Sequence, residues 1–550
     1  YTRDRRPGAN RAGRYRDAMT DPAPADAPPR ASLVLSALIL AALVCNINLA
    51  AANIALPDIG DAFGANQTSL NLVALGCSLG LAMSVLYLGA LADRYGRKQL
   101  LMLGLALTVV ASLFSAFSPS IELLIASRIF TGIAAGMAYP TTLSLITALW
   151  SNGPKRTGAI ALWSSVSAMA TVIGSVLAGL LLQVFWWGSA FLLALPIAAA
   201  ALILVAILVP AHVKESTDPV DHRGGVLATF AIAALVLGIS MIFAPGQFLL
   251  GAVLLGMAIV LLVLFGWRQA VTSHPLYDLR VARRRLFWVP AAAGTIVFGS
   301  LMGAMFVGQQ FLQNILGYNT LEAGLAVVPA AVGLLVVAPI SARLVTARGS
   351  RVTMLVGYAL VFVGFVTCLF WREQTPYPLI GFGFLVIGAG AAFAMTPASR
   401  ALTESTPVRR VGMASATSDL QRDLGGSIMQ ALLGAILATG FAAAFGRSIA
   451  ASPQASEISD SVTAALQASF ASALHVADQY PQYKTEILDA ASHSLVAGAL
   501  GAYLVGAIAI ALGASLVAFF LPGRAREREL IELYETQDAS HTTNSAPQRR

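Results

Sequence analysis

Apolar residues in this chain form long continuous stretches, unlike the alternating pattern of a sheet or the one-sided stripe of a soluble helix. Stretches of about twenty residues, long enough to cross a hydrocarbon core of about 30 Å as α-helix, recur from Ala31 to Phe520. We therefore predict an all-α integral membrane protein with fourteen transmembrane helices. The predicted spans are approximately 32–56, 69–91, 99–118, 123–148, 158–182, 188–209, 225–244, 247–267, 287–312, 324–342, 352–371, 379–398, 412–444 and 494–521.

The polar segments around these spans predict two tails and one sizeable connection. Residues 1–30 are rich in Arg, Pro, Ala and Asp and show no apolar period, so we expect a disordered cytoplasmic tail in which Met19 is a candidate native start. Residues 447–493 have helix-like apolar spacing, which predicts short amphipathic helices over the outer face. Residues 522–550 form a second cytoplasmic tail.

Basic residues follow this predicted topology. The net charge is +8, and with both termini inside, 30 of the 35 Lys and Arg residues fall on the inner side. Only Arg372, Arg447 and Lys484 fall outside, while Arg128 and Arg422 lie within helices. Because basic residues in short loops orient membrane proteins with those loops inside, we interpret the positive charge as a topology signal and expect no nucleic-acid binding.

Several kinds of chemistry lack a sequence signal. The three cysteines all fall in apolar helices, which favours packing over a disulfide framework, and we expect no metal site and no cofactor. No GxxxxGK[ST] phosphate loop is present, and the chain has no large polar insertion that could hold a nucleotide-hydrolysing domain. Any transport would therefore draw its energy from a gradient.

The most specific motif is GALADRYGRK at residues 89–98, on the inner side between the second and third spans. Gly89 and Gly96 allow a tight turn and a close helix approach. Asp93, Arg94 and Arg97 can make charge-assisted contacts that exist in only one conformation. We therefore predict that these five residues control a conformational change, although a helix hairpin with basic anchors would need some of them too.

This motif resembles the signature of the major facilitator superfamily, and the resemblance covers nearly the whole chain. RIFTGIAAG at 128–136 is similar to the family's second motif, whose buried arginine, here Arg128, is associated with proton transfer. QQFLQNILGY at 309–318 resembles the fourteen-helix drug:proton antiporter branch, and WWGSAF at 186–191 resembles its quaternary-ammonium efflux members.

The resemblance implies an architecture and a transport mechanism. Two pseudosymmetric six-helix bundles, 31–209 and 287–521, would flank two inserted helices in 225–267. Substrate would bind near the midplane between bundles that rock to give alternating access. The resemblance implies no enzymatic activity.

Two acidic residues in the thirteenth predicted span are candidates for proton coupling. Asp419 and Asp423 are four residues apart and share one helix face with Gln430. Because a charge inside a membrane is costly, such carboxylates suggest a proton relay or a cation site. The alternative is that Arg422 only neutralises one of them as an ion pair. For Arg128 the alternative to proton transfer is pairing with a backbone carbonyl or a polar neighbour.

Polar and aromatic residues in several spans are candidates for lining a substrate cavity. Each could instead pack between helices or hydrogen-bond a neighbouring helix. The candidates are Asn48, Tyr139, Trp163, Phe306, Gln309, Gln310, Gln313 and Gln430.

The chain departs from the drug-antiporter pattern at two places. Asn48, which cannot titrate, occupies the position at which the first helix of these antiporters usually carries Asp. The antiporter motif of the fifth helix is degenerate, because its proline is replaced in Gly174-Ser175 before Gly179. Both changes bear on the proton stoichiometry and on the preference for cationic drugs.

The sequence thus predicts a secondary transporter of a prokaryotic plasma membrane. We expect it to export amphipathic small molecules, cationic ones in particular, in exchange for protons, with lipids as its surroundings and no oligomer required. An exporter of an endogenous lipid or metabolite with altered or no proton coupling is the first alternative. A transport-inactive membrane scaffold or sensor is the second.

Overall fold

A computed structural model describes residues 28–544, except for 151–153, 212–218, 243, 245, 407–410 and 454–457. The described chain is helical almost throughout. Its first helices are α1 (Ala31–Phe63), α2 (Gln67–Tyr95), α3 (Arg97–Ala116), α4 (Ile121–Leu149), α5 (Pro154–Leu182), α6 (Ser189–Leu192) and α7 (Ala194–Leu208). They are followed by α8 (His222–Ile242), α9 (Phe248–Val271), α10 (Leu279–Ala282), α11 (Arg285–Asn314), α12 (Thr320–Ala326) and α13 (Val328–Arg348). The last are α14 (Ser350–Cys368), α15 (Tyr377–Glu404), α16 (Val411–Ala451), α17 (Asp460–Ala468), α18 (Phe470–Gln479), the 3₁₀ turn η3 (Pro481–Tyr483), α19 (Lys484–Phe520) and α20 (Arg524–Asn544).

Within the described residues, thirteen helical segments are long and apolar enough to cross a membrane. The remaining predicted span, 158–182, lies in α5, where the described apolar segment is Ile173–Leu182. The prediction of an all-α membrane protein is confirmed, whereas the count of fourteen crossings and the cytoplasmic position of both termini stay predictions. Met19 and most of the first tail lie outside the described residues.

Helices extend past the predicted spans because backbone hydrogen bonding does not stop at the edge of an apolar stretch. The first span was predicted to end near residue 56, but α1 continues to Phe63 and ends where Gly64 adopts a left-handed φ of 57°. The Asn66 side chain then accepts a hydrogen bond from the Ser69 N–H and starts α2. The predicted span 324–342 is divided between α12 and α13 at Val327, two residues before Pro329, which has no N–H to donate.

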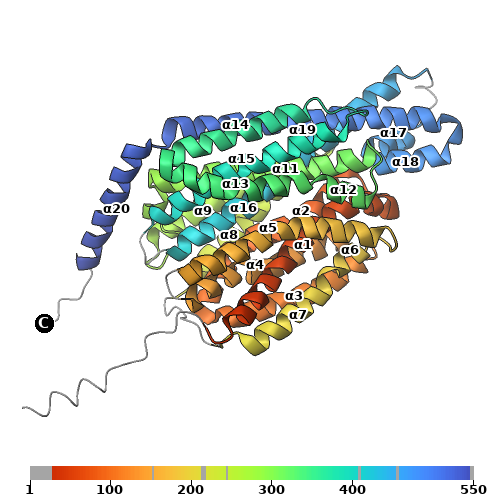
Figure 1. Cartoon of the computed structure of the whole chain (residues 1–550). Helices are drawn as coiled ribbons and strands as arrows, with labels where there is room; N and C mark the ends of the chain where they lie inside the picture. The colour runs from red at the N-terminus through yellow and green to blue at the C-terminus, as the bar shows by residue number, and fades with distance from the viewer. Residues whose placement is uncertain are drawn as a thin grey trace, which may run out of the picture.

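The helices pack in two groups, which Figure 1 shows as a red-to-yellow half beside a green-to-blue half. Helices α1 to α7 pack mainly on one another, as do α11 and α13 to α16 with α19. The halves meet where α2 lies on α16 and where α5 lies on α12. Helix α8 packs on α2 and α16, and α9 packs on α8; most large apolar side chains of α9 are exposed, as expected of a lipid-facing helix.

Close packing inside the first half depends on glycine. A Cβ on Gly132 of α4 would lie 2.1 Å from the Cys77 carbonyl oxygen, and one on Gly80 of α2 would lie 2.1 Å from the Ile129 oxygen. Small residues on facing sides let membrane helices approach backbone to backbone. The α2–α4 contact is therefore fixed by residues that cannot be enlarged without moving a helix.

One end of the helix stack carries α17, α18 and η3, which lie in the connection 447–493. Ser469, just before α18, donates a hydrogen bond of 3.0 Å to the Ala65 carbonyl oxygen at the end of α1. The opposite end carries α20, whose Asp538 forms an ion pair of 2.6 Å with Arg284 at the start of α11. We call these the α17 end and the α20 end; the charge distribution predicts that the α20 end faces the cytoplasm.

Candidate functional site

The motif at residues 89–98 forms the turn between α2 and α3 at the α20 end. Gly96 has a φ of 116°, a conformation that favours glycine, and Arg97 begins α3. The Arg97 guanidinium pairs with Asp93 at 2.8 Å and donates to the Ser144 carbonyl oxygen of α4 at 3.4 Å. A Cβ on Gly89 would meet no atom within 4 Å, so this glycine is not required for packing in this conformation.

Lys98, which follows the predicted gating residues, ties this turn to α7. Its Nζ donates to the carbonyl oxygens of Ala206 and Val209, at 2.8 and 2.7 Å, where α7 ends. A cation at the C-terminal end of a helix is favourable because unpaired carbonyls gather there. These contacts connect α2, α3, α4 and α7, so the motif holds the α20 end of the first half together.

Arg128 is fully buried in the first half and has no carboxylate partner among the described residues. Its Nη2 donates to the backbone oxygen of Asn48 at 2.7 Å, and its guanidinium lies 5.0 Å from the centre of the Phe191 ring. Within the described part of the chain, its Nε and Nη1 have no hydrogen-bond partner. The Asn48 side chain donates instead to the Val44 oxygen within α1.

The second predicted coupling site joins the two halves. Asp423 of α16 is buried, with one carboxylate oxygen 3.3 Å from Arg422 Nε and the other without a hydrogen-bond partner. Arg422 reaches across to α4, where it donates to the Tyr139 hydroxyl and lies 4.1 Å from the centre of its ring. The Tyr139 ring packs 5.5 Å from the ring of Trp163 in α5. The side chain of Asp419 lies outside the described residues.

Arg422 therefore has a contact that sequence reasoning missed. The sequence indicates only that Arg422 is next to Asp423, because Tyr139 is 283 residues away. The structure places Arg422 between a buried carboxylate and an aromatic ring of the opposite half.

The predicted amide residues separate into two groups. Gln310 accepts a 2.8 Å hydrogen bond from Gln67 of α2, which links the halves, and Gln430 Nε2 lies 3.5 Å from the Asn53 side-chain oxygen of α1. Gln309 instead donates to the backbone oxygen of Ala323 in α12. Gln67 and Asn53 were not predicted, since single amides in apolar helices carry no pattern.

A small cavity lies beside the Gln67–Gln310 pair. It is lined by Leu56, Pro57, Gln67, Leu70, Gln310, Asn314, Phe470 and Ala471, and its volume of about 10 Å³ has room for about one water molecule. Phe306 is fully buried in the core, and Gln313 has an unpartnered, buried Nε2. Of the predicted cavity residues, only Gln310 lines this space.

The degenerate antiporter motif lies at the seam of the two halves near the α17 end. The Gly179 carbonyl oxygen accepts a 3.0 Å hydrogen bond from Thr320 of α12. A Cβ on Gly179 would lie 2.6 Å from the Thr320 oxygen, and one on Gly324 would lie 2.9 Å from the Ser175 oxygen. A Cβ on Gly174 would lie 3.0 Å from the Ile47 Cα of α1. In this conformation α5 and α12 thus touch backbone to backbone.

Sequence comparisons place the chain among transporters. The family model described as the Major Facilitator Superfamily matches residues 38–430. The multidrug efflux pump LfrA of Mycolicibacterium smegmatis is 30% identical, over 90% of this chain and 97% of LfrA. The multidrug resistance protein Stp of Mycobacterium tuberculosis is 30% identical, over 70% of this chain and 72% of Stp. The methyl viologen resistance protein SmvA of Salmonella typhimurium is 30% identical, over 72% of this chain and 80% of SmvA.

Solved structures share the fold at lower sequence identity. A bacterial homologue of the human lysosomal transporter Spinster superposes with a TM-score of 0.61 at 16% identity, over 89% of this chain and 97% of that structure. The nucleoside transporter NupG superposes with a TM-score of 0.57 at 11% identity, over 89% of this chain and all of that one. The family match and the relatives named for multidrug efflux and multidrug resistance indicate a multi-pass membrane transporter of small molecules and not an enzyme. The chain belongs to the Major Facilitator Superfamily and groups with its multidrug efflux members.

Proposed function

We propose that this protein exports amphipathic cations across a prokaryotic plasma membrane in exchange for protons. The observation that carries the proposal is the bridge from Asp423 through Arg422 to Tyr139, because it connects a buried carboxylate to the contact between the halves. The proposal includes fourteen membrane crossings and cytoplasmic termini. It also includes two bundles, 31–209 and 287–521, that rock against each other. The efflux names of the relatives at 30% identity support it.

Proton binding at Asp423 would change the bridge directly. One oxygen of this carboxylate faces Arg422 and the other has no hydrogen-bond partner, so a proton can bind there without displacing a donor. Protonation removes the negative charge that offsets the guanidinium. Arg422 is then less firmly positioned over Tyr139, and the two halves lose a contact that they hold in this conformation.

The same bridge suggests how a cationic substrate takes part. The guanidinium of Arg422 lies over the Tyr139 ring, which is the position that a quaternary ammonium group occupies in a cation–π contact. A cationic substrate would compete with Arg422 for the Tyr139 ring. Substrate and proton would then act on one element, which is the requirement for coupling two ligands through a conformational equilibrium.

The two glycine-containing motifs would control which side of the protein is open. The turn at 89–98 would hold the α20 end of the first half, and Gly174, Ser175 and Gly179 would close the seam at the α17 end against α12. Arg128 would take part in proton movement through its Nε and Nη1, which have no hydrogen-bond partner among the described residues. These roles, and that of Asp419, follow from the family resemblance together with the contacts described above.

Transport by the purified protein in liposomes tests the proposal. With an imposed pH gradient, wild-type protein should accumulate ethidium, and Asp423→Asn should lose the gradient-driven part. Asp460→Asn, in the exposed helix α17, is a matched control that should transport normally. Unchanged transport in both Asp419→Asn and Asp423→Asn would remove these residues from coupling. Movement of lipid but not ethidium would favour the exporter of an endogenous compound, and no movement of any amphiphile would favour a scaffold.

A further inference from the structure

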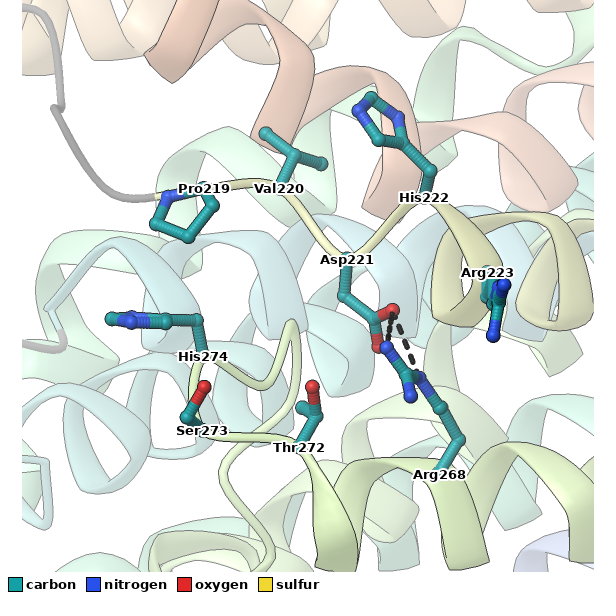
Figure 2. Close-up of a pocket in the computed structure, with 9 residues that line it drawn as sticks. All are labelled: Pro219, Val220, Asp221, His222, Arg223, Arg268, Thr272, Ser273 and His274. Carbon is teal, nitrogen blue, oxygen red and sulfur yellow. Dashed lines mark hydrogen bonds and ion pairs between the residues drawn. The ribbon is translucent and has the colours of Figure 1, made fainter.

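An open cavity of about 330 Å³ lies at the α20 end, between the start of α8 and the end of α9. These are the two helices that lie between the halves in the sequence, and the transport proposal gives them no task. Figure 2 shows the cavity between the segment 219–222 above and the segment 272–274 below. Its lining residues are Pro219, Val220, Asp221, His222, Arg223, Arg268, Thr272, Ser273 and His274.

The lining offers hydrogen-bond donors and a net positive charge. The lining holds two arginines, Arg223 and Arg268, and one carboxylate, Asp221, so one positive charge remains even when both histidines are neutral. Arg223 and the hydroxyls of Thr272 and Ser273 have no side-chain partner within the described part of the chain, and Figure 2 shows both hydroxyls directed toward the cavity. An anion with several oxygen atoms could accept hydrogen bonds from all of these donors.

Asp221 offsets one of the two arginine charges, and three donors hold its carboxylate in place. It accepts hydrogen bonds of 3.1 Å from Arg268 Nε, the Gly224 N–H and Gln269 Nε2. Burial alone would raise the pKa of Asp221, but these donors together hold it below its ordinary value. The carboxylate thus stays ionised and positions Arg268 at the cavity wall.

The cavity opens beside a helix face that is built for lipid. Val263 and Trp267 of α9 are 65% exposed, and Val271, at the end of α9, is 66% exposed. Tryptophan at this position is typical of the boundary between hydrocarbon and headgroups. A molecule whose acyl chains lie along α9 would place its headgroup at the level of Arg268, one residue after Trp267.

We propose that this cavity binds the phosphate group of an anionic phospholipid, with Arg223, Arg268, Thr272 and Ser273 as its donors. Basic pockets between membrane helices on the cytoplasmic side are suited to such headgroups. Because α8 packs on both α2 and α16 and α9 packs on α8, a lipid bound there contacts a helix pair that lies against both halves through α8. Free phosphate has the same headgroup chemistry but would leave the apolar face of α9 unused.

Lipid retention by the full-length protein in detergent tests this site by native mass spectrometry. Wild-type protein should retain palmitoyl-oleoyl phosphatidylglycerol in preference to phosphatidylcholine with the same acyl chains. Arg223→Gln should lower phosphatidylglycerol retention about fivefold, equivalent to the ~1 kcal/mol that one basic residue contributes near an anionic surface. Arg343→Gln, an exposed arginine near the end of α13, is the matched control and should leave retention unchanged.

Three results would overturn the proposal. The first is phosphatidylglycerol retention by Arg223→Gln that equals retention by the wild type. If Arg223→Gln does not fold, Ser273→Ala takes its place and should lower retention about threefold. Unchanged retention by Ser273→Ala would then overturn the proposal. The second is equal retention of phosphatidylcholine. The third is competition by glycerol 3-phosphate at the concentration at which phosphatidylglycerol binds, which would assign the site to a soluble phosphate. The measurement does not depend on transport, so it can fail while the transport proposal stands.

Discussion

Replacing Arg128 with methionine separates a structural role of this residue from a functional one. The guanidinium is fully buried, and its Nε and Nη1 have no partner. A buried polar group without a hydrogen bond costs about 1–3 kcal/mol, and more when it is charged. Methionine fills a similar space, and it removes two such groups together with an unpaired charge. Against this, the substitution loses one charge-assisted hydrogen bond to Asn48, about 1.5–3 kcal/mol, and a cation–π contact with Phe191 of about 2 kcal/mol.

These opposing terms nearly balance, so Arg128→Met should be neutral or stabilising by up to about 2 kcal/mol. An arginine with an ion-pair partner behaves differently. Arg284 forms a bidentate pair with Asp538 and donates to the Ser405 oxygen, so Arg284→Met should destabilise the protein by at least about 1 kcal/mol. Arg284→Met is therefore the control for loss of a paired arginine.

Thermal unfolding in detergent can be followed with a dye that fluoresces on reaction with thiols. The three cysteines are all free and buried, so they react only as the fold opens. Arg128→Met should unfold at or above the wild-type temperature and still lose gradient-driven ethidium transport, which would assign Arg128 to function. Unfolding as early as Arg284→Met would refute the reasoning, because it would mean that the guanidinium has a stabilising partner.

Three further predictions follow from contacts described above. Gly132→Ala should destabilise the protein by about 1–3 kcal/mol and lower its unfolding temperature, because the added methyl group would overpack against the Cys77 oxygen. Gly256→Ala, with open space around it, should leave the unfolding temperature unchanged. Equal unfolding temperatures for the two variants would contradict the backbone contact. Arg422→Gln should loosen the contact between the halves. The yield of cross-linking between one cysteine introduced in α4 and one in α16 should therefore decrease, and an unchanged yield would argue against the bridge. Asp221→Asn should cost about 1–2 kcal/mol at neutral pH. The pKa of Asp221 is lower in the folded protein than its unfolded value of about 3.9. The difference in stability between wild type and Asp221→Asn should therefore persist above pH ~4 and shrink as the pH falls through the folded pKa. Unfolding measured against pH tests this, and a stability difference that does not change with pH would contradict the assignment.

Much of the fold was predictable because a helix that crosses a membrane must be apolar along nearly its whole length. Continuous apolar stretches located the helices, and the motif at 89–98 identified the turn between α2 and α3. In the structure this turn has Gly96 at a positive φ and an ion pair between Asp93 and Arg97. Helix ends were less accurate. They depend on single residues such as Gly64 and Pro329, whose effect on the backbone is local and does not change the apolar count.

The candidate site was predictable only in part. Sequence patterns identified Asp423 and Arg128 because a charge in an apolar stretch is conspicuous. They could not give the partners, since Tyr139 and Arg422 are 283 residues apart and Gln67 and Gln310 are 243 residues apart. Neither pair has a spacing that a helix or a turn could reveal.

The sequence alone thus determined that the chain spans a membrane, which motifs it carries and which charges lie within apolar spans, because hydrophobicity and local turn chemistry act on neighbouring residues. Only the tertiary structure decided that Arg422 bridges the two halves, that two nitrogens of Arg128 have no hydrogen-bond partner among the described residues, and that the start of α8 and the end of α9 form a basic cavity. Those features depend on which helix faces lie against one another, and that depends on packing between segments far apart in the chain.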